Sequence, residues 1–304
     1  MKYRIVHITR YSGTEPISVG HNEAWLTPRD STSQKCLNHT LDIRPEPSIT
    51  SRRTDYFGNT VTQFSFNQGY RALTVTAVNE VDLQIPTRPT TVDPAWETVV
   101  ESVRRHQTPE DLTAYEFGFD SPRCKSRDEF AEYGRVSFYP GRPILEALSD
   151  LMRRIHTEFR YDTLATSVTT PVDQVFKLRK GVCQDFSHLM ISILRSLGLA
   201  ACYVSGYLRT LPPPGRPRLV GADASHAWLS AWCGPMGWVD LDPTNNKIPD
   251  VDHITVARGR DYGDVAPLKG VYIGGGKHEL TVSVDVSEVE AGAGAPVQTA
   301  TGVS

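Results

Sequence analysis

The sequence predicts an α+β protein with two parts: an antiparallel, sandwich-like β-domain first, and a domain of mixed helices and strands after it. Near the start of the chain, Leu73, Val75 and Ala77 alternate with polar residues, which is the two-residue period of a half-buried strand. Further on, apolar residues from Phe186 to Leu197 recur every three or four positions, as on one face of a helix. A chain of 304 residues is long enough for two such domains.

The predicted β-domain covers residues 1–86, where short alternating segments are separated by turn residues. Residues 87–97 are rich in Pro and Thr and are predicted to be a linker. The second domain is expected over 98–287, with a weakly patterned loop region at 106–140 and a last alternating strand near 280–286. Residues 288–304 have a low-complexity composition that is typical of a disordered tail.

Cys183 is the first candidate for chemistry, because it lies at the start of the predicted helix that runs to Leu197. Gly181 supplies a tight turn before this helix, and Gly198 is placed to end it. Unpaired N–H groups and the positive end of the helix dipole favour a thiolate at such a position. A small buried cysteine with no reactivity is the plain alternative.

His226 and Asp242 are predicted to lie on consecutive strands of one hairpin. If its turn centres on Pro235, position 226 faces position 244, and Asp242 is the diagonal neighbour on the same face. A base beside the thiol and a carboxylate that orients the base are what a cysteine nucleophile needs. A turn of two residues would reverse this parity. Asp240 shares the face but lies further from His226.

Three other histidines are weighed as bases. His188 is close to Cys183 in sequence, but five residues along a helix it points about 140° away. Spacing alone does not exclude His253 or His278. The alternative without catalysis is that His226 is an ordinary histidine of the sheet and that Asp242 belongs to a turn that ends a strand.

Three blocks resemble the signature motifs of the bacterial transglutaminase-like superfamily: Gly181–Phe186, Ser225–Trp228 and Gly237–Asn245. They occur in the family's order, with 43 residues from Cys183 to His226 and 16 from there to Asp242. The N-terminal 86 residues are similar to the β-domain that precedes the catalytic domain in many bacterial members. The resemblance implies a papain-like α+β catalytic domain.

By this resemblance Cys183 is the nucleophile, His226 the general base and acid, and Asp242 the residue that orients the imidazole. It implies thiol attack on an amide, peptide or isopeptide carbonyl, with a thioester that water or an amine resolves. The backbone N–H of Cys183 is a natural oxyanion donor. Five further residues are candidates for substrate contact, Gln184 also for the second oxyanion donor: Gln184, Trp228, Arg260, Asp261 and Tyr262.

Composition excludes several other classes of protein. A net charge of −3 without a long basic run argues against nucleic-acid binding, and the most apolar segment is too mixed for a membrane span. Five widely spaced cysteines without a C-x-x-C pair argue against a zinc site and fit a reducing compartment. With no apolar leader at the N-terminus, a cytoplasmic protein is expected. No cofactor or metal is predicted, and no calcium loop is visible.

The leading interpretation is therefore a thiol enzyme acting on protein or peptide substrates, with hydrolysis favoured over cross-linking because water is the default acceptor. The alternative is a transglutaminase-like interaction module whose chemistry is idle. A redox-sensing cysteine ranks last, because it would need a resolving cysteine nearby. The oligomeric state is left open.

Overall fold

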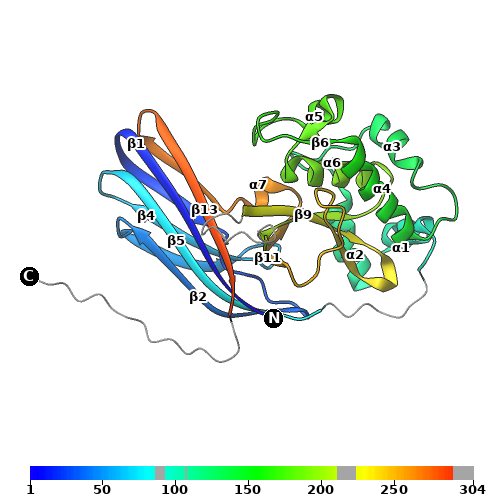
Figure 1. The fold of residues 1–304 in the computed structure, drawn as a ribbon, viewed down its shortest axis with the longest axis horizontal. Helices are drawn as coiled ribbons and strands as arrows, with labels where there is room; N and C mark the ends of the chain where they lie inside the picture. The colour runs from blue at the N-terminus through cyan, green and yellow to red at the C-terminus, as the bar shows by residue number, and fades with distance from the viewer. Residues whose placement is uncertain (86–92, 107, 211–223, 290–304) are drawn as a thin grey trace, which may run out of the picture.

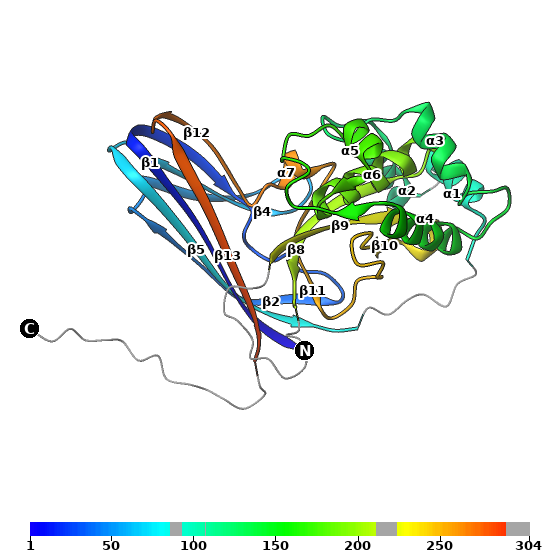
Figure 2. The same cartoon turned by 45° about the horizontal axis from the view of Figure 1, so that its top comes forward.

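The computed structural model describes residues 1–85, 93–106, 108–210 and 224–289. Within them, a large antiparallel sheet and a mixed helix–sheet part lie side by side (Figures 1 and 2). Most of the predicted linker 87–97 and all but two residues of the predicted tail 288–304 fall outside the described residues. None of the described helices combines the length and the apolar character needed to span a bilayer.

The N-terminal sheet confirms the predicted antiparallel fold class and contains seven strands. Its long first strand, β1, has different neighbours along its two halves: Tyr3 pairs with Val81 of β5, whereas His21 pairs with Ser65 of β4. The order is β2-β5-β1-β4-β3, and β12 and β13 also pair with β1. The strands are β1 (Lys2–Ala24), β2 (Gln34–Arg44), β3 (Ile49–Thr54), β4 (Thr60–Phe66), β5 (Tyr70–Leu83), β12 (Leu268–Gly274) and β13 (His278–Glu288).

Strand β13 corrects the predicted domain boundary. The alternating strand near 280–286 was assigned to the second domain, but the structure returns it to the first sheet, where it lies beside β1 (Figure 1). Its buried residues Val284 and Val286 share a core with Tyr3 and Ile5. Alternation identifies a half-buried strand but carries no information about its partner, so the pattern alone could not place it.

The second part packs helices around a four-stranded sheet of order β10-β9-β8-β11. Two short helices, α2 and α3, lie in the region 106–140 that the sequence predicted as loop; α2 has a Thr108 cap and Pro109 in its first turn. The helices are α1 (Trp96–Arg105), α2 (Pro109–Tyr115), α3 (Asp128–Arg135), α4 (Ile144–Glu158), α5 (Val172–Leu178), α6 (Cys183–Ser196) and α7 (Tyr262–Val265). The strands are β6 (Arg160–Tyr161), β7 (Lys180–Gly181), β8 (Ala201–Leu208), β9 (Ala224–Trp232), β10 (Trp238–Leu241) and β11 (His253–Gly259).

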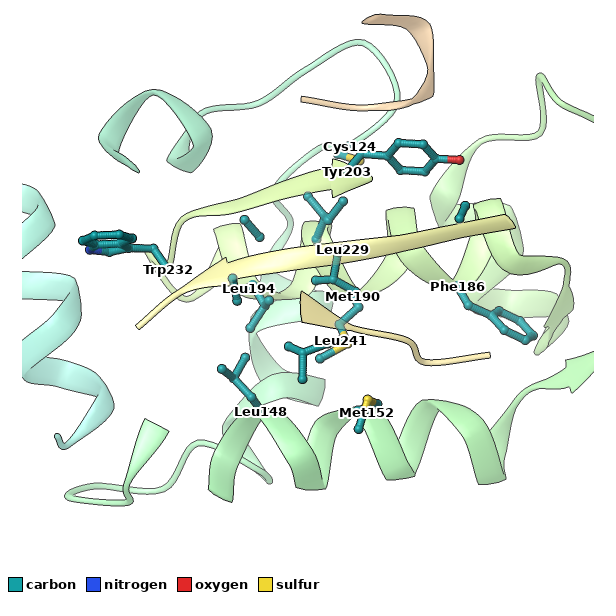
Figure 3. Packing of buried hydrophobic residues seen from close by; sticks show 14 of the residues in the cluster. Cys124, Leu148, Met152, Phe186, Met190, Leu194, Tyr203, Leu229, Trp232 and Leu241 are labelled. Atoms are coloured by element: carbon teal, nitrogen blue, oxygen red, sulfur yellow. The ribbon is translucent and has the colours of Figure 1, made fainter. Parts of the chain in front are cut away.

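Helix α6 is the centre of this part and is buried on all sides, not on the one face that its apolar spacing predicts. Every residue from Gln184 to Arg195 is buried. Figure 3 shows Met190 and Leu194 between Leu229 of β9 and the side chains of α4. The guanidinium of Arg195 is satisfied by donating to the carbonyls of Phe117, Ala201 and Arg260 and to the Ser121 hydroxyl. Such a helix is a rigid support for the residue at its first position.

Two side-chain amides of the N-terminal sheet hold the outer edge of β11, the edge strand of the smaller sheet. Gln34 exchanges two hydrogen bonds with the backbone of Thr255, at 2.7 and 2.8 Å. Asn59 does the same with the backbone of Arg258, at 2.8 and 2.9 Å. The amides therefore take the place of a neighbouring strand and connect the two parts of the molecule.

Candidate active site

Cys183 is the first residue of α6 and is partly exposed. The turn before it is held by Asp185, whose carboxylate accepts hydrogen bonds from the Val182 N–H at 2.9 Å and from the Thr166 hydroxyl at 2.6 Å. A Cβ at Gly181 would lie 2.7 Å from the same carboxylate, so only glycine fits there. Because the N–H groups of a first helical turn have no partner within the helix, this end of α6 carries partial positive charge.

The hairpin that carries His226 and Asp242 has the predicted register. Trp232 pairs with Trp238, which centres the connection on Pro235. Nε2 of His226 lies 2.8 Å from Oδ2 of Asp242, and the carboxylate is completely buried. The structure thus brings together the two residues that the strand pairing predicted as diagonal neighbours.

The Cys183 side chain lies near enough to His226 to raise the pKa of the imidazole. Because Nε2 faces Asp242, Nδ1 is the ring nitrogen left for the sulfur. Burial disfavours the charged ring, but the hydrogen bonds and negative charges of Asp242 and Cys183 outweigh it and raise the pKa of His226 to about 10. The three side chains predicted as a catalytic triad are in contact in the order Cys183–His226–Asp242.

Asp242 accepts hydrogen bonds from five donors. The backbone N–H groups of Thr244 and Asn245 reach Oδ1, at 3.0 and 3.2 Å. Oδ2 faces His226, the Asn245 amide at 2.7 Å and Nε2 of His253 at 3.1 Å. Burial raises the pKa of a carboxyl group, but these donors outweigh it and hold the pKa of Asp242 well below its usual range.

Asn245 and His253 are the residues that sequence reasoning did not assign to the site. Asn245 follows Asp242 by three residues, so the turn Asp-Pro-Thr-Asn already carried a signal for its contact with the carboxylate. His253 begins β11, which is separated from β9 by β8, and only the sheet order brings it to Asp242.

His226, Asp242 and His253 form a group whose potential ligand atoms lie within 4.8 Å of one another, among the described residues. Two imidazoles and a carboxylate are suitable ligands for zinc. Both imidazole Nε2 atoms, however, lie at hydrogen-bond distance from the same carboxylate oxygen, and a metal on Nε2 of His226 would leave the ring hydrogen on Nδ1, the nitrogen that must accept the thiol proton. Hydrogen bonding is therefore the arrangement that this geometry fits.

The five candidates for substrate contact have different environments. Trp228 is completely buried and donates to Asp240, and Asp261 is buried as the cap of α7, so both are parts of the core and correct the prediction. Gln184 donates from its amide to the Val168 carbonyl at 3.2 Å. The other two, Tyr262 and Arg260, are partly exposed; Tyr262 packs against the Tyr203 ring, and Arg260 is ion-paired with Asp264 at 2.9 Å.

Tyr161 is an exposed aromatic side chain next to the sulfur that the sequence did not indicate. It lies on β6, which runs parallel to β7, and it pairs with Gly181, two residues before Cys183. The negative charge of Cys183 contributes to the raised pKa of Tyr161, after the larger effect of burial. The pairing of β6 with β7 therefore brings an exposed aromatic residue near the start of α6.

The remaining thiols and His188 do not share the environment of the triad. Burial raises the pKa of the other four cysteine thiols, to about 12 for Cys124 and about 11 for Cys202. His188 accepts a hydrogen bond from the Tyr262 N–H, and burial lowers its pKa to about 3. A histidine that stays neutral and already accepts a backbone bond is not a base for Cys183.

Two family models match the chain: the bacterial transglutaminase-like N-terminal region over residues 3–82 and the transglutaminase-like superfamily over 139–243. The second range contains the three triad residues and ends before His253. An uncharacterized protein of Mycobacterium tuberculosis is 42% identical over 295 residues, which are 95% of this chain and 93% of that protein.

Two further relatives are more distant. A protein-glutamine gamma-glutamyltransferase of Pseudomonas aeruginosa is 30% identical over 129 residues, which are 36% of this chain and 19% of that protein. Among solved structures, a candidate cysteine protease of Cytophaga hutchinsonii superimposes with a TM-score of 0.75, covering 96% of this chain and 91% of that one at 21% identity. This likeness shows the fold.

Proposed function

The chain belongs to the transglutaminase-like superfamily, and from that premise we propose that it is a thiol enzyme that acts on amide, peptide or isopeptide bonds of protein or peptide substrates. The single observation that supports this most is the position of His226 between the Cys183 sulfur and the buried Asp242 carboxylate. An imidazole held in this way stabilises a thiolate beside it and can return the proton to a leaving group.

In the proposed reaction the Cys183 thiolate adds to the substrate carbonyl carbon, and the oxyanion faces the N–H of Cys183 at the start of α6. The tetrahedral intermediate collapses to a thioester as the leaving nitrogen takes the proton of His226. A water molecule then gives a proton to His226 and attacks the thioester. The products are a carboxylic acid and the restored thiol–imidazole pair.

We propose water over an amine as the usual acceptor. Cys183 is partly exposed, and its neighbour Tyr161 is 54% exposed, so water can reach the thioester. An amine would resolve the same thioester by transglutamination if the site bound it and excluded water. The two reactions differ only after the thioester has formed.

A cytoplasmic location is part of the proposal. All five cysteines are free thiols, which is the state that a reducing compartment maintains. The nucleophile needs to remain reduced as well, because a disulfide or a sulfenic acid at Cys183 would prevent the attack.

The test is the rate of alkylation of each cysteine as a function of pH, read peptide by peptide in the wild type and in His226→Ala. We expect Cys183 to react at lower pH than the other four thiols and to lose this reactivity in the variant. The other four thiols are internal controls, and Cys36 is the one among them that is also partly exposed. A Cys183 that titrates as a plain thiol and ignores His226 would refute the enzymatic proposal and favour an idle interaction module.

The reaction itself is then measured with glutaminyl peptides in the presence and absence of a primary amine. Hydrolysis releases ammonia or a new terminus without the amine, whereas transglutamination requires it. Cys183→Ala is the control and is expected to abolish both products. Product that persists in this variant would arise from another group.

A further inference from the structure

His253 contacts the triad from a part of the chain that the proposed mechanism does not use. It is the first residue of β11 and is 4% exposed, and its Nε2 lies 3.1 Å from Oδ2 of the completely buried Asp242. An ionised carboxylate only accepts hydrogen bonds, so Nε2 of His253 is the donor and carries a proton.

The surroundings of the other ring nitrogen, Nδ1, indicate which tautomer His253 adopts. No described residue offers a hydrogen-bond partner to Nδ1. The ring lines a cavity of about 80 Å³ between the two parts of the molecule, together with Asp240 and Arg258. A buried N–H without a partner is costly, and a buried lone pair without a partner costs less. The tautomer with hydrogen on Nε2 alone is therefore the one that these surroundings favour.

His253 differs from the other donors in where it comes from. Thr244 and Asn245 belong to the same turn as Asp242, so they follow the carboxylate wherever that turn moves. His253 reaches the same oxygen from another strand of the sheet, two positions away from β9 in the sheet order. It therefore fixes the carboxylate relative to the sheet that carries His226.

The ring of His253 is itself held from two directions. It packs edge-to-face on Trp228, with centroids 5.2 Å apart, and Trp228 is anchored by its donation to Asp240 at 3.2 Å. Two residues along β11, Gln34 of the N-terminal sheet holds the Thr255 backbone by two hydrogen bonds. A ring packed and supported in this way has little freedom to turn away from Asp242.

We propose that His253 is a positioning residue: its Nε2–H donor holds Oδ2 of Asp242 ionised and turned toward His226, and so keeps the imidazole in place for Cys183. The proposal rests on the proposed function, since it assumes that the Cys183–His226 pair is the reacting pair. His253 acts through Asp242 and does not touch the sulfur. The N-terminal sheet contributes to the site by supporting the strand that carries His253.

The experiment compares the pH dependence of Cys183 alkylation in the wild type, His253→Leu and His253→Gln. Leucine removes the donor at similar volume, whereas the side-chain amide of glutamine can present an N–H near the position of Nε2. In His253→Leu we expect the reactivity to move to higher pH and the rate at pH 7 to fall about tenfold, as for the loss of one hydrogen bond to a charged group. His253→Gln should restore most of the wild-type profile.

His7→Leu is the matched control for the loss of a buried imidazole. His7 is 1% exposed and bonds to the Tyr207 and Thr9 hydroxyls at 3.0 and 2.9 Å, away from the triad. We expect it to lower the melting temperature and to leave the pH profile of Cys183 unchanged. An unchanged profile in His253→Leu, with a wild type that reacts at low pH, would overturn the positioning role and leave the proposed enzyme intact. A wild-type Cys183 that behaves as a plain thiol would overturn both.

A second measurement needs no variant, so it still tests the proposal if His253→Leu does not fold. In the wild type labelled with ¹⁵N-histidine, the imidazole ¹⁵N shifts report which nitrogen of His253 carries hydrogen. Hydrogen on Nε2 is the expected result. Hydrogen on Nδ1 alone would point a lone pair at the carboxylate and would refute the proposal, whatever the fate of the triad.

Discussion

Nε2 of His226 lies 2.8 Å from Oδ2 of Asp242, although 16 residues separate the two in the chain. The hairpin of β9 and β10 makes this contact, because the loop 233–237 sets a register in which Trp232 pairs with Trp238. The pair is almost completely removed from water, with side-chain exposures of 8% and 0%. Its charge state therefore matters for stability as well as for chemistry, and the following predictions use it.

The contribution of His226 to the stability of the protein should fall as pH rises from 6.5 to 8. The folded protein holds this proton up to a pKa of about 10, whereas the unfolded chain releases it near pH 6.5. In this window the folded state binds more protons than the unfolded chain. The contribution of His226 to the free energy of unfolding is therefore fully present below pH 6.5 and decreases above it, by at most about 1.4 kcal/mol per pH unit for one proton.

Urea unfolding of the wild type and of His226→Gln at several pH values between 6.5 and 8 checks this. The cysteines of the unfolded chain begin to titrate at about pH 8 in both proteins alike, so their effect cancels in the comparison. Burial lowers the pKa of His7 to about 4 and that of His188 to about 3, so both add a slope of the opposite sign in the two proteins alike. The difference in unfolding free energy between the wild type and the variant is therefore what should decrease as pH rises. Parallel curves for the two proteins would show that His226 is not charged in the folded state.

Asp242→Asn should lower the pKa of His226 and slow Cys183 alkylation at pH 7, by roughly a hundredfold if the carboxylate acts as in other triads. The amide cannot supply the negative charge that stabilises the imidazolium. Asp240→Asn is the matched control, because Asp240 lies on β10 two residues before Asp242 but bonds to Trp228 and Arg258 instead. Equal rates in the two variants would contradict the assignment of Asp242.

Gly206→Ala should destabilise the protein by about 1–3 kcal/mol, as for overpacked cores. A Cβ at this position would lie 2.2 Å from the Ile254 carbonyl and 2.5 Å from the Trp228 ring, the same ring that supports His253. Thermal melts of this variant and of Gly118→Ala provide the test, since a Cβ at Gly118 meets nothing within 4 Å. Similar melting temperatures for both variants would argue against the close packing around β8.

Gln34→Ala should loosen β11 and raise the hydrogen-exchange rate of the Thr255 amide, which donates to the Gln34 side chain at 2.8 Å. Gln63→Ala is the control: Gln63 also donates from a side-chain amide, but to Glu23 within the N-terminal sheet. Mass-resolved exchange of the peptide that contains β11 distinguishes the two. Unchanged protection in Gln34→Ala would show that the N-terminal sheet does not support this strand.

The sequence by itself determined the features that depend on local pattern. The start of α6 at Cys183 follows from a glycine turn and a helical apolar period, and the contact of His226 with Asp242 follows from the alternation of two neighbouring strands around Pro235. Both are contacts between segments that are close in the chain, where the periods of helix and strand dictate which side chains share a face.

The tertiary structure alone decided the contacts between distant segments. The pairing of β13 with β1, the burial of Trp228 and the arrival of His253 at Asp242 all depend on the order in which strands join their sheets. Alternating apolar residues indicate that a strand has a buried face. The backbone hydrogen bonds along its edges, however, are the same for any partner strand. Only packing of the whole core selects one order, and with it the second imidazole beside the triad.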